Sequence, residues 1–187
     1  MHVIALTGLL FQLVSGAPAP AAVGERTEYY EITGSSAREL RKAIDRLRPT
    51  DAKGERFDAH TKWDVRWRYQ LTLGERSCAL REFGTSVQIL ITLPNWARRP
   101  AGSALAARWE RYSEALSEHE REHVAIGVRA ASAIQERVSA LEAAPTCQLL
   151  EQSIKTKAES ILDEFRAEEA TYDRRTRHGA TQGALFP

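Results

Sequence analysis

Residues 103–141 read SALAARWERYSEALSEHEREHVAIGVRAASAIQERVSAL, and the spacing of apolar residues in this stretch decides the fold. The apolar residues recur at steps of three and four, which is the period of a helix with one buried face. They form a stripe of Leu105, Trp109, Tyr112, Leu116, Ile126, Ala130, Ile134, Val138 and Leu141. The pattern predicts one long helix that ends before Pro145, because proline cannot continue a helix.

A second helical pattern begins after a short connection and runs from about Cys147 to Tyr172. Its apolar stripe consists of Leu150, Ile154, Ala158, Ile161 and Phe165. Two long helices joined by so short a turn are expected to form an antiparallel hairpin.

Two strand patterns precede these helices. Residues 61–73 and 78–93 alternate between apolar and polar side chains, which predicts two half-buried strands that pair antiparallel across a turn at Gly74. Gly84 interrupts the second alternation and predicts a bulge. Pro94 is expected to end the second strand.

The region before these strands predicts two short elements. Residues 27–32 favour a strand, and a capping box from Ser36 to Glu39 predicts a helix over residues 37–47. The expected fold is therefore α+β, with a small antiparallel sheet packed on the long antiparallel helical hairpin.

Composition excludes several classes of protein. The chain has 187 residues, of which 43% are hydrophobic and 27% charged, so it can bury a core and is not disordered throughout. Its net charge of +1 argues against a nucleic-acid surface, which needs a clustered basic face. The interior of the chain has no run of about 20 apolar residues, so no interior membrane span is expected.

The N-terminus and the cysteines point to export. The apolar run from Val3 to Val14, followed by Ala19-x-Ala21, predicts a signal peptide over residues 1–21 and a single mature domain over residues 22–187. A short buried N-terminal helix is the alternative. Cys78 and Cys147 form an even pair that could make one disulfide in an oxidising compartment, or remain two buried thiols. We therefore expect a secreted or periplasmic protein.

The middle of the long helix carries the motif His119-Glu120-Arg121-Glu122-His123. Histidines four residues apart lie on one helix face, so both imidazoles can reach one metal ion. Glu120 can sit beside such an ion and accept a proton from a zinc-activated water. Both histidines continue the apolar stripe, which favours metal binding over a solvated charged face, although a hydrogen-bonded pair of core histidines is an alternative.

Three residues are candidates for the third metal ligand. Equal rise along the two helices places residues 166–172 level with the two histidines, so the C-terminal segment is expected to complete the site. His178 is the first choice there. Glu169 could ligate with Asp173 as an orienting group, or Asp173 could ligate directly.

Four sequence blocks together resemble a known family. The blocks are Thr61-x-Trp63, Leu93-Pro94-x-Trp96, Trp109 with His119-Glu120-x-x-His123, and Tyr172-Asp173-x-x-Thr176-x-His178-Gly179-x-Thr181-Gln182-Gly183. They resemble a bacterial domain-of-unknown-function family described as predicted secreted zinc-dependent proteases. The resemblance covers about residues 27–187 and implies a bacterial secreted or periplasmic zinc metallopeptidase. It also strengthens His178 as a ligand.

The expected function is therefore a zinc-dependent metallopeptidase with a zincin-like fold. One Zn²⁺ would be held by His119, His123 and His178, Glu120 would be the general base, and a peptide or protein would be the substrate. Tyr172 could donate a hydrogen bond to the oxyanion or be only a core aromatic. The alternative is a non-catalytic metal-binding or metal-stabilised envelope protein, in which a fourth protein ligand closes the site.

Overall fold

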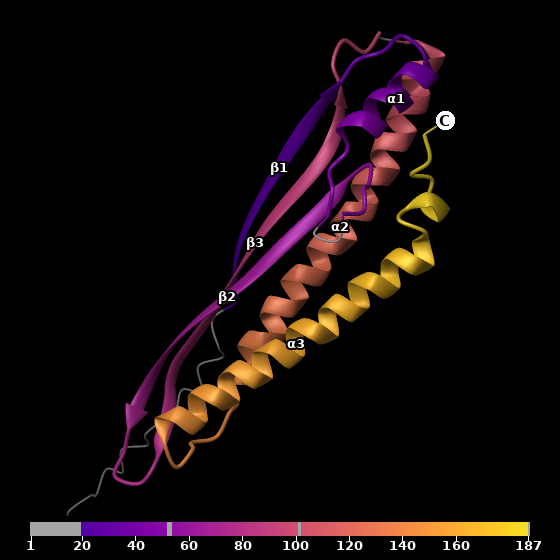
Figure 1. Ribbon diagram of the computed structural model, residues 1–187. Coiled ribbons are helices and arrows are strands. Elements are labelled where there is room, and N and C mark those ends of the chain that lie inside the picture. The colour runs from indigo at the N-terminus through magenta and orange to yellow at the C-terminus, as the bar shows by residue number, and fades with distance from the viewer. Residues whose placement is uncertain (1–19, 52–53, 101, 187) are drawn as a thin grey trace, which may run out of the picture.

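The computed structural model describes residues 20–51, 54–100 and 102–186 of the chain. An elongated, twisted sheet forms one layer, and two long helices form the other layer (Figure 1). The elements, in chain order, are β1 (Ala22–Ile32), α1 (Ala37–Leu47), β2 (His60–Leu73), β3 (Cys78–Trp96), α2 (Ala104–Ser139), α3 (Cys147–Thr176) and a 3₁₀ turn, η1 (Ala180–Gln182). The α+β class is as expected, and the expected signal peptide lies outside the described residues except for its last two positions.

The sheet is mixed, which corrects the predicted antiparallel sheet. Its strand order is β1-β3-β2. β2 pairs antiparallel with β3, as the hairpin pattern predicted, but β1 pairs parallel with β3 along its whole length. Alternation within a strand identifies its buried face but contains no information on the direction of its partner, which depends here on the crossover through α1.

Two predictions for β3 were wrong in detail. The strand continues through Pro94 to Trp96. Its pairing with β2 ends at Thr92, so Pro94 lies where β1 is the only neighbouring strand, and a missing N–H is tolerated at such an edge. Gly84 pairs regularly with Arg68, and the register shift lies instead between Gln70 and Leu71.

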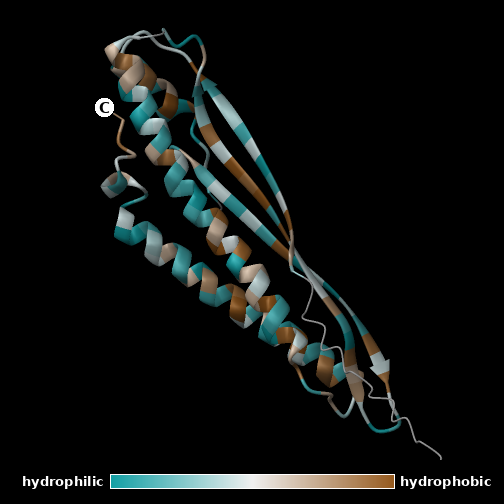
Figure 2. Ribbon diagram, turned by 180° about the vertical axis from the view of Figure 1, so that it is seen from behind, coloured by the Kyte–Doolittle hydropathy of each residue, from teal (hydrophilic) through white to brown (hydrophobic). Residues whose placement is uncertain are grey.

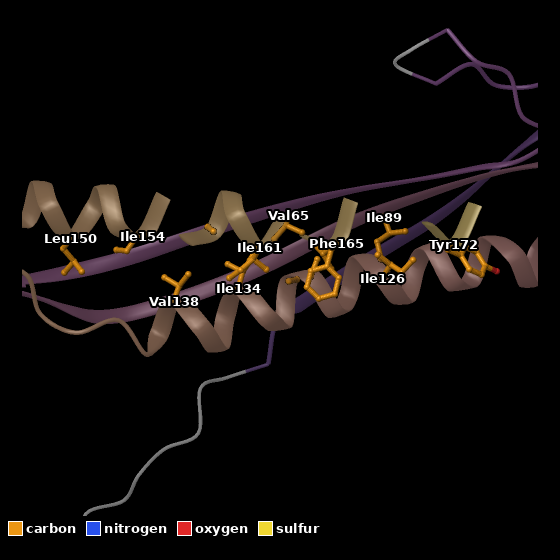
Figure 3. Close-up of a cluster of buried hydrophobic side chains, with 14 of the residues drawn as sticks. Val65, Ile89, Ile126, Ile134, Val138, Leu150, Ile154, Ile161, Phe165 and Tyr172 are labelled. Atoms are coloured by element: carbon orange, nitrogen blue, oxygen red, sulfur yellow. The ribbon is translucent and has the colours of Figure 1, made fainter. Parts of the chain in front are cut away.

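The main core lies between the sheet and the paired helices. Figure 3 shows side chains from β2, β3, α2 and α3 meeting there, with Tyr172 at one end of the row. The hydrophobic faces of the helices turn toward the sheet (Figure 2). The contacts between the two helices run in opposite sequence order along them, since Arg137 pairs with Glu164 and Arg129 with Glu168. α3 therefore returns alongside α2 (Figure 1).

A disulfide between Cys78 and Cys147 joins the start of β3 to the start of α3. The backbone of Cys78 also exchanges hydrogen bonds with Ala144 in the connection between the helices (2.7 and 2.9 Å). Both contacts fix the end of the helix pair that lies nearest its turn. Among the described helices, none combines the length and apolar character needed to cross a membrane.

Candidate metal centre

The two histidines of the motif lie on the buried face of α2, one helical turn apart. Their exposed fractions are 3% for His119 and 6% for His123, so both occupy the core-facing stripe as the sequence predicted. The two Nε2 atoms are 3.3 Å apart. The helix therefore directs both imidazoles at one point.

Asp173, near the end of α3, completes a cluster with these histidines. Its Oδ1 lies 3.2 Å from His119 Nε2 and 3.1 Å from His123 Nε2. The three atoms form a nearly equilateral triangle, and these three residues together could hold a metal ion. Asp173 was one of three residues proposed from the sequence as the additional ligand.

His178 lies beside this cluster rather than inside it. Its Nδ1 is 3.5 Å from Asp173 Oδ1, and half of its side chain is exposed. Its ring packs against Phe57 at a centroid distance of 4.8 Å. The structure thus brings His178 next to the acidic member of the triangle, and its role as a metal ligand stays a prediction.

Glu169 contacts the side of His123 that faces away from the triangle. Its Oε1 lies 3.1 Å from His123 Nδ1 and also accepts a hydrogen bond from Trp63 Nε1 (3.0 Å). A carboxylate on Nδ1 favours the tautomer in which Nδ1 carries the proton and Nε2 is free to ligate. This geometry supports an orienting role for Glu169 and not a ligating one.

His119 has an equivalent outer partner, Gln182. The Gln182 Oε1 lies 3.0 Å from His119 Nδ1, and its amide also hydrogen-bonds the Tyr172 hydroxyl. The Tyr172 ring stacks on the His119 ring at 4.9 Å. Because its hydroxyl is held on the Nδ1 side of His119, Tyr172 packs and positions this histidine, and the suggested oxyanion role has no support in the geometry.

Glu120 is buried next to the triangle, with 4% of its surface exposed. Thr61, at the start of β2, donates a hydrogen bond from its Oγ1 to Glu120 Oε2 (2.7 Å). Burial raises the pKa of the Glu120 carboxyl, an effect that the Thr61 hydroxyl and the two neighbouring histidines partly oppose. A carboxyl with a raised pKa beside paired histidines is suited to proton transfer.

Two groups of the cluster, His123 and Asp173, have strongly shifted pKa values. Burial acts to lower the pKa of His123, but the hydrogen bonds that it donates to Asp173 and Glu169 outweigh burial and raise that pKa to about 10. Burial acts to raise the pKa of Asp173, and the bonds to His119 and His123 hold it below its usual range. The protonated form of His123 is therefore favoured by the two carboxylates that it contacts.

These residues line a single cleft. His119, Glu120, His123, Glu169, Asp173 and His178 line it together with the first residues of β2. His60 lies there as the first residue of β2, one residue before the predicted start of this strand.

One protein-family model matches residues 27–179, and its description is bacterial protein of unknown function (DUF922). The chain belongs to this family. The match includes the whole cluster of this DUF922 chain and ends just before the turn that carries Gln182. The description states no activity, and neither the curated proteins nor the solved structures contain a match to the chain.

Sequence reasoning missed the functions of three residues in this DUF922 chain. Thr61 and Trp63 had appeared in the predicted strand over residues 61–73 and in one motif block, and Gln182 had appeared only as part of another block. The available signal was the polar Thr61 on the side of β2 that otherwise carries apolar groups. A polar group on a core-facing position needs a buried partner, and the partner here is Glu120.

Proposed function

We propose that this protein is a secreted zinc-dependent metallopeptidase with a zincin-like arrangement. His119, His123 and Asp173 would hold one Zn²⁺, and Glu120 would act as the general base. The observation that carries the proposal is the buried Glu120 carboxylate, which lies next to a triangle of three ligand atoms with edges of 3.1, 3.2 and 3.3 Å.

The dimensions of the triangle support zinc. Ligand atoms about 2.0–2.1 Å from a tetrahedral zinc ion are about 3.3 Å apart, which agrees with the three edges. Two imidazole nitrogens and one carboxylate oxygen are also a common donor set for catalytic zinc. When bound, Zn²⁺ supplies a Lewis acid that lowers the pKa of water toward neutrality.

The chain's own residues provide the proton transfers. Thr61 fixes one oxygen of Glu120, so the carboxylate enters the cleft in a defined orientation. Its raised pKa suits a group that takes a proton from the attacking water and returns it to the leaving amine. Glu169 and Gln182 hold the outer nitrogens of the two histidines and so keep both Nε2 atoms directed at Asp173.

β2 supports a peptide as the substrate. It pairs with β3 on one side and is an edge strand of the described sheet. Its first residues, His60 to Asp64, line the cleft beside the cluster. An extended peptide can add to such an edge through backbone hydrogen bonds, which would place its amide groups beside Glu120.

Three features support export of the protein. The family is bacterial. The Cys78–Cys147 disulfide is typical of oxidising compartments such as the periplasm. β1 begins at Ala22, which is the first residue of the expected mature chain.

The decisive experiment compares wild type with Glu120→Gln. We expect the variant to bind zinc within about threefold of wild type, while its hydrolysis of an unstructured protein such as casein falls by at least about 100-fold, as for loss of a general base. Glu118→Gln is the matched control, because Glu118 is an exposed glutamate on the same helix. Full activity in Glu120→Gln, or zinc-loaded wild type that hydrolyses no peptide mixture, would overturn the proposal.

The alternative is a non-catalytic, metal-stabilised protein, and one observation favours it. Asp173 Oδ1 lies within 3.5 Å of His178 Nδ1 as well as near both other histidines, so four side chains could surround one ion. A closed set of four protein ligands is typical of structural zinc.

Substitution of His178 distinguishes the two functions. For the peptidase we expect Asp173→Ala to weaken zinc binding by more than about 100-fold, and His178→Ala to weaken it by less than about tenfold. Competition with a chromophoric chelator measures both affinities. Equal losses in the two variants would indicate a closed four-ligand site and favour the structural role.

A further inference from the structure

The C-terminal segment Gly179–Phe186 contacts the buried His119 of the cluster. After α3 the chain turns through Arg177 and His178, both at positive φ, and then through Gly179 and the turn η1. Figure 1 shows this segment running beside α2, away from the end of α3. The turn brings the backbone against α2, which bears His119.

Gly179 allows the segment to touch His119 directly. Its φ is +81°, and a Cβ placed on it would lie 3.1 Å from His119 Cγ and 3.0 Å from Ala184 Cβ. No larger residue fits this position without displacing the imidazole or the segment. The backbone at Gly179 is therefore one wall of the His119 site.

Gln182 makes the polar contact of the segment with His119. Its Oε1 lies 3.0 Å from His119 Nδ1, while its Nε2 donates to the Tyr172 hydroxyl at 3.1 Å. The hydroxyl in turn lies 3.5 Å from the backbone oxygen of His119. Because an amide oxygen only accepts, this contact favours the neutral tautomer of His119 that carries its proton on Nδ1 and leaves Nε2 free to bind an ion.

The end of the segment is anchored independently of the cluster. Phe186 is buried against Trp109 and Tyr112 on α2, at centroid distances of 5.4 and 5.1 Å. The segment is thus held by α3 before Gly179 and by an aromatic contact after Gln182. Between these two anchors, Gln182 is the residue whose side chain contacts His119.

We propose that the segment Gly179–Phe186 is a metal-responsive clamp in which Gln182 is the positioning residue for His119. Gln182 selects the histidine tautomer that can ligate, so docking of the segment strengthens metal binding. By thermodynamic reciprocity, metal binding must stabilise the docked segment to the same extent. This inference rests on the metal centre of the proposed function but not on peptidase activity.

The first test measures zinc affinity in the full mature chain. Gln182→Ala should raise the zinc dissociation constant about 10- to 100-fold, as expected for loss of an outer partner of a ligating histidine. Gln182→Glu should restore binding to within about threefold, because a carboxylate also accepts from Nδ1–H. Leu185→Ala is the matched control, since Leu185 is an exposed residue of the same segment. The absorption spectrum of bound Co²⁺ should change in Gln182→Ala and recover in Gln182→Glu.

The second test is hydrogen exchange of the segment. Zinc should slow exchange at the amides of residues 179–186 in wild type and in Leu185→Ala, but much less in Gln182→Ala. Urea titrations without metal identify a variant that simply fails to fold, and the wild-type exchange result then still decides. Unchanged zinc affinity in folded Gln182→Ala, or no effect of zinc on exchange in wild type, would overturn the clamp. A zinc-responsive clamp in a protein that hydrolyses nothing would overturn only the peptidase.

Discussion

Asp58 holds the loop before β2 in place. Arg41 donates two hydrogen bonds to its carboxylate (2.6 and 2.7 Å), and Tyr112 donates a third (2.7 Å). Tyr30 donates to its backbone oxygen. The loop leads directly into Thr61, which holds Glu120, so this network connects α1, β1 and α2 to the orientation of the proposed base.

We expect Asp58→Asn to destabilise the fold by about 2–3 kcal/mol, because the half-buried Arg41 loses its two-bond carboxylate partner and keeps only the more exposed Asp45. Burial acts to raise the pKa of Asp58, but Arg41 and Tyr112 hold it below its ordinary value. A depressed pKa gives stability that is present above the unfolded value of about 3.9 and lost as the pH falls through the folded pKa. The difference between wild type and variant should therefore shrink below about pH 4.

Urea unfolding in the presence of a chelator, at pH 7 and at pH 3, measures this difference. Asp64→Asn is the control, because Asp64 pairs with Arg66 on the exposed face of β2 and should change stability by less than about 0.5 kcal/mol. A difference for Asp58→Asn that stays constant between the two pH values would exclude the ionic contribution of Asp58.

At the scale of the elements, periodicity predicted the features of a helix or strand that depend on its own sequence alone. α1 has the predicted bounds, with Ser36 accepting from the Glu39 backbone as its cap. β2 has the predicted alternation from Thr61 to Trp67, whereas Tyr69 and Leu73 of the same face are exposed. α2 and α3 differ from their predicted ranges only at their ends. The direction of β1 and the continuation of β3 through Pro94 were not predictable, because they depend on which strand lies alongside.

The same limit explains the third ligand. Equal rise along the helices predicted that residues 166–172 lie level with the histidines; Glu169 lies within this range and Asp173 lies one residue beyond it. Position along α3 does not tell which of its side chains turns toward the cluster. His178 follows a left-handed helix cap at Arg177, so its direction depends on loop dihedral angles that periodicity does not describe.

At the scale of the whole molecule, the helix pair is fastened at both of its ends. The disulfide to Cys147 lies at the start of α3, and Asp173 lies near its end, about 39 Å away at 1.5 Å per residue. The Arg137–Glu164 and Arg129–Glu168 pairs between them are exposed and contribute little. The disulfide and the cluster that includes Asp173 therefore hold opposite ends of one long core.

We expect the disulfide and zinc binding at the cluster to stabilise the fold independently. The disulfide closes a loop of 69 residues, and its loss in Cys78→Ala/Cys147→Ala should cost about 4 kcal/mol. Zinc at 100 times its dissociation constant for the wild type should add about 2.7 kcal/mol to the wild type and, at the same concentration, an equal amount to the variant. Because the sites share no partner, the effects should add within about 0.5 kcal/mol, as measured by urea unfolding of both proteins with zinc and with chelator. Alanine is used because a cysteine thiol in the unfolded chain would itself bind zinc. A coupling above about 1 kcal/mol would contradict independence and would mean that the disulfide aligns α3 as a rigid unit, so that the position of Asp173 is set from the far end of its helix.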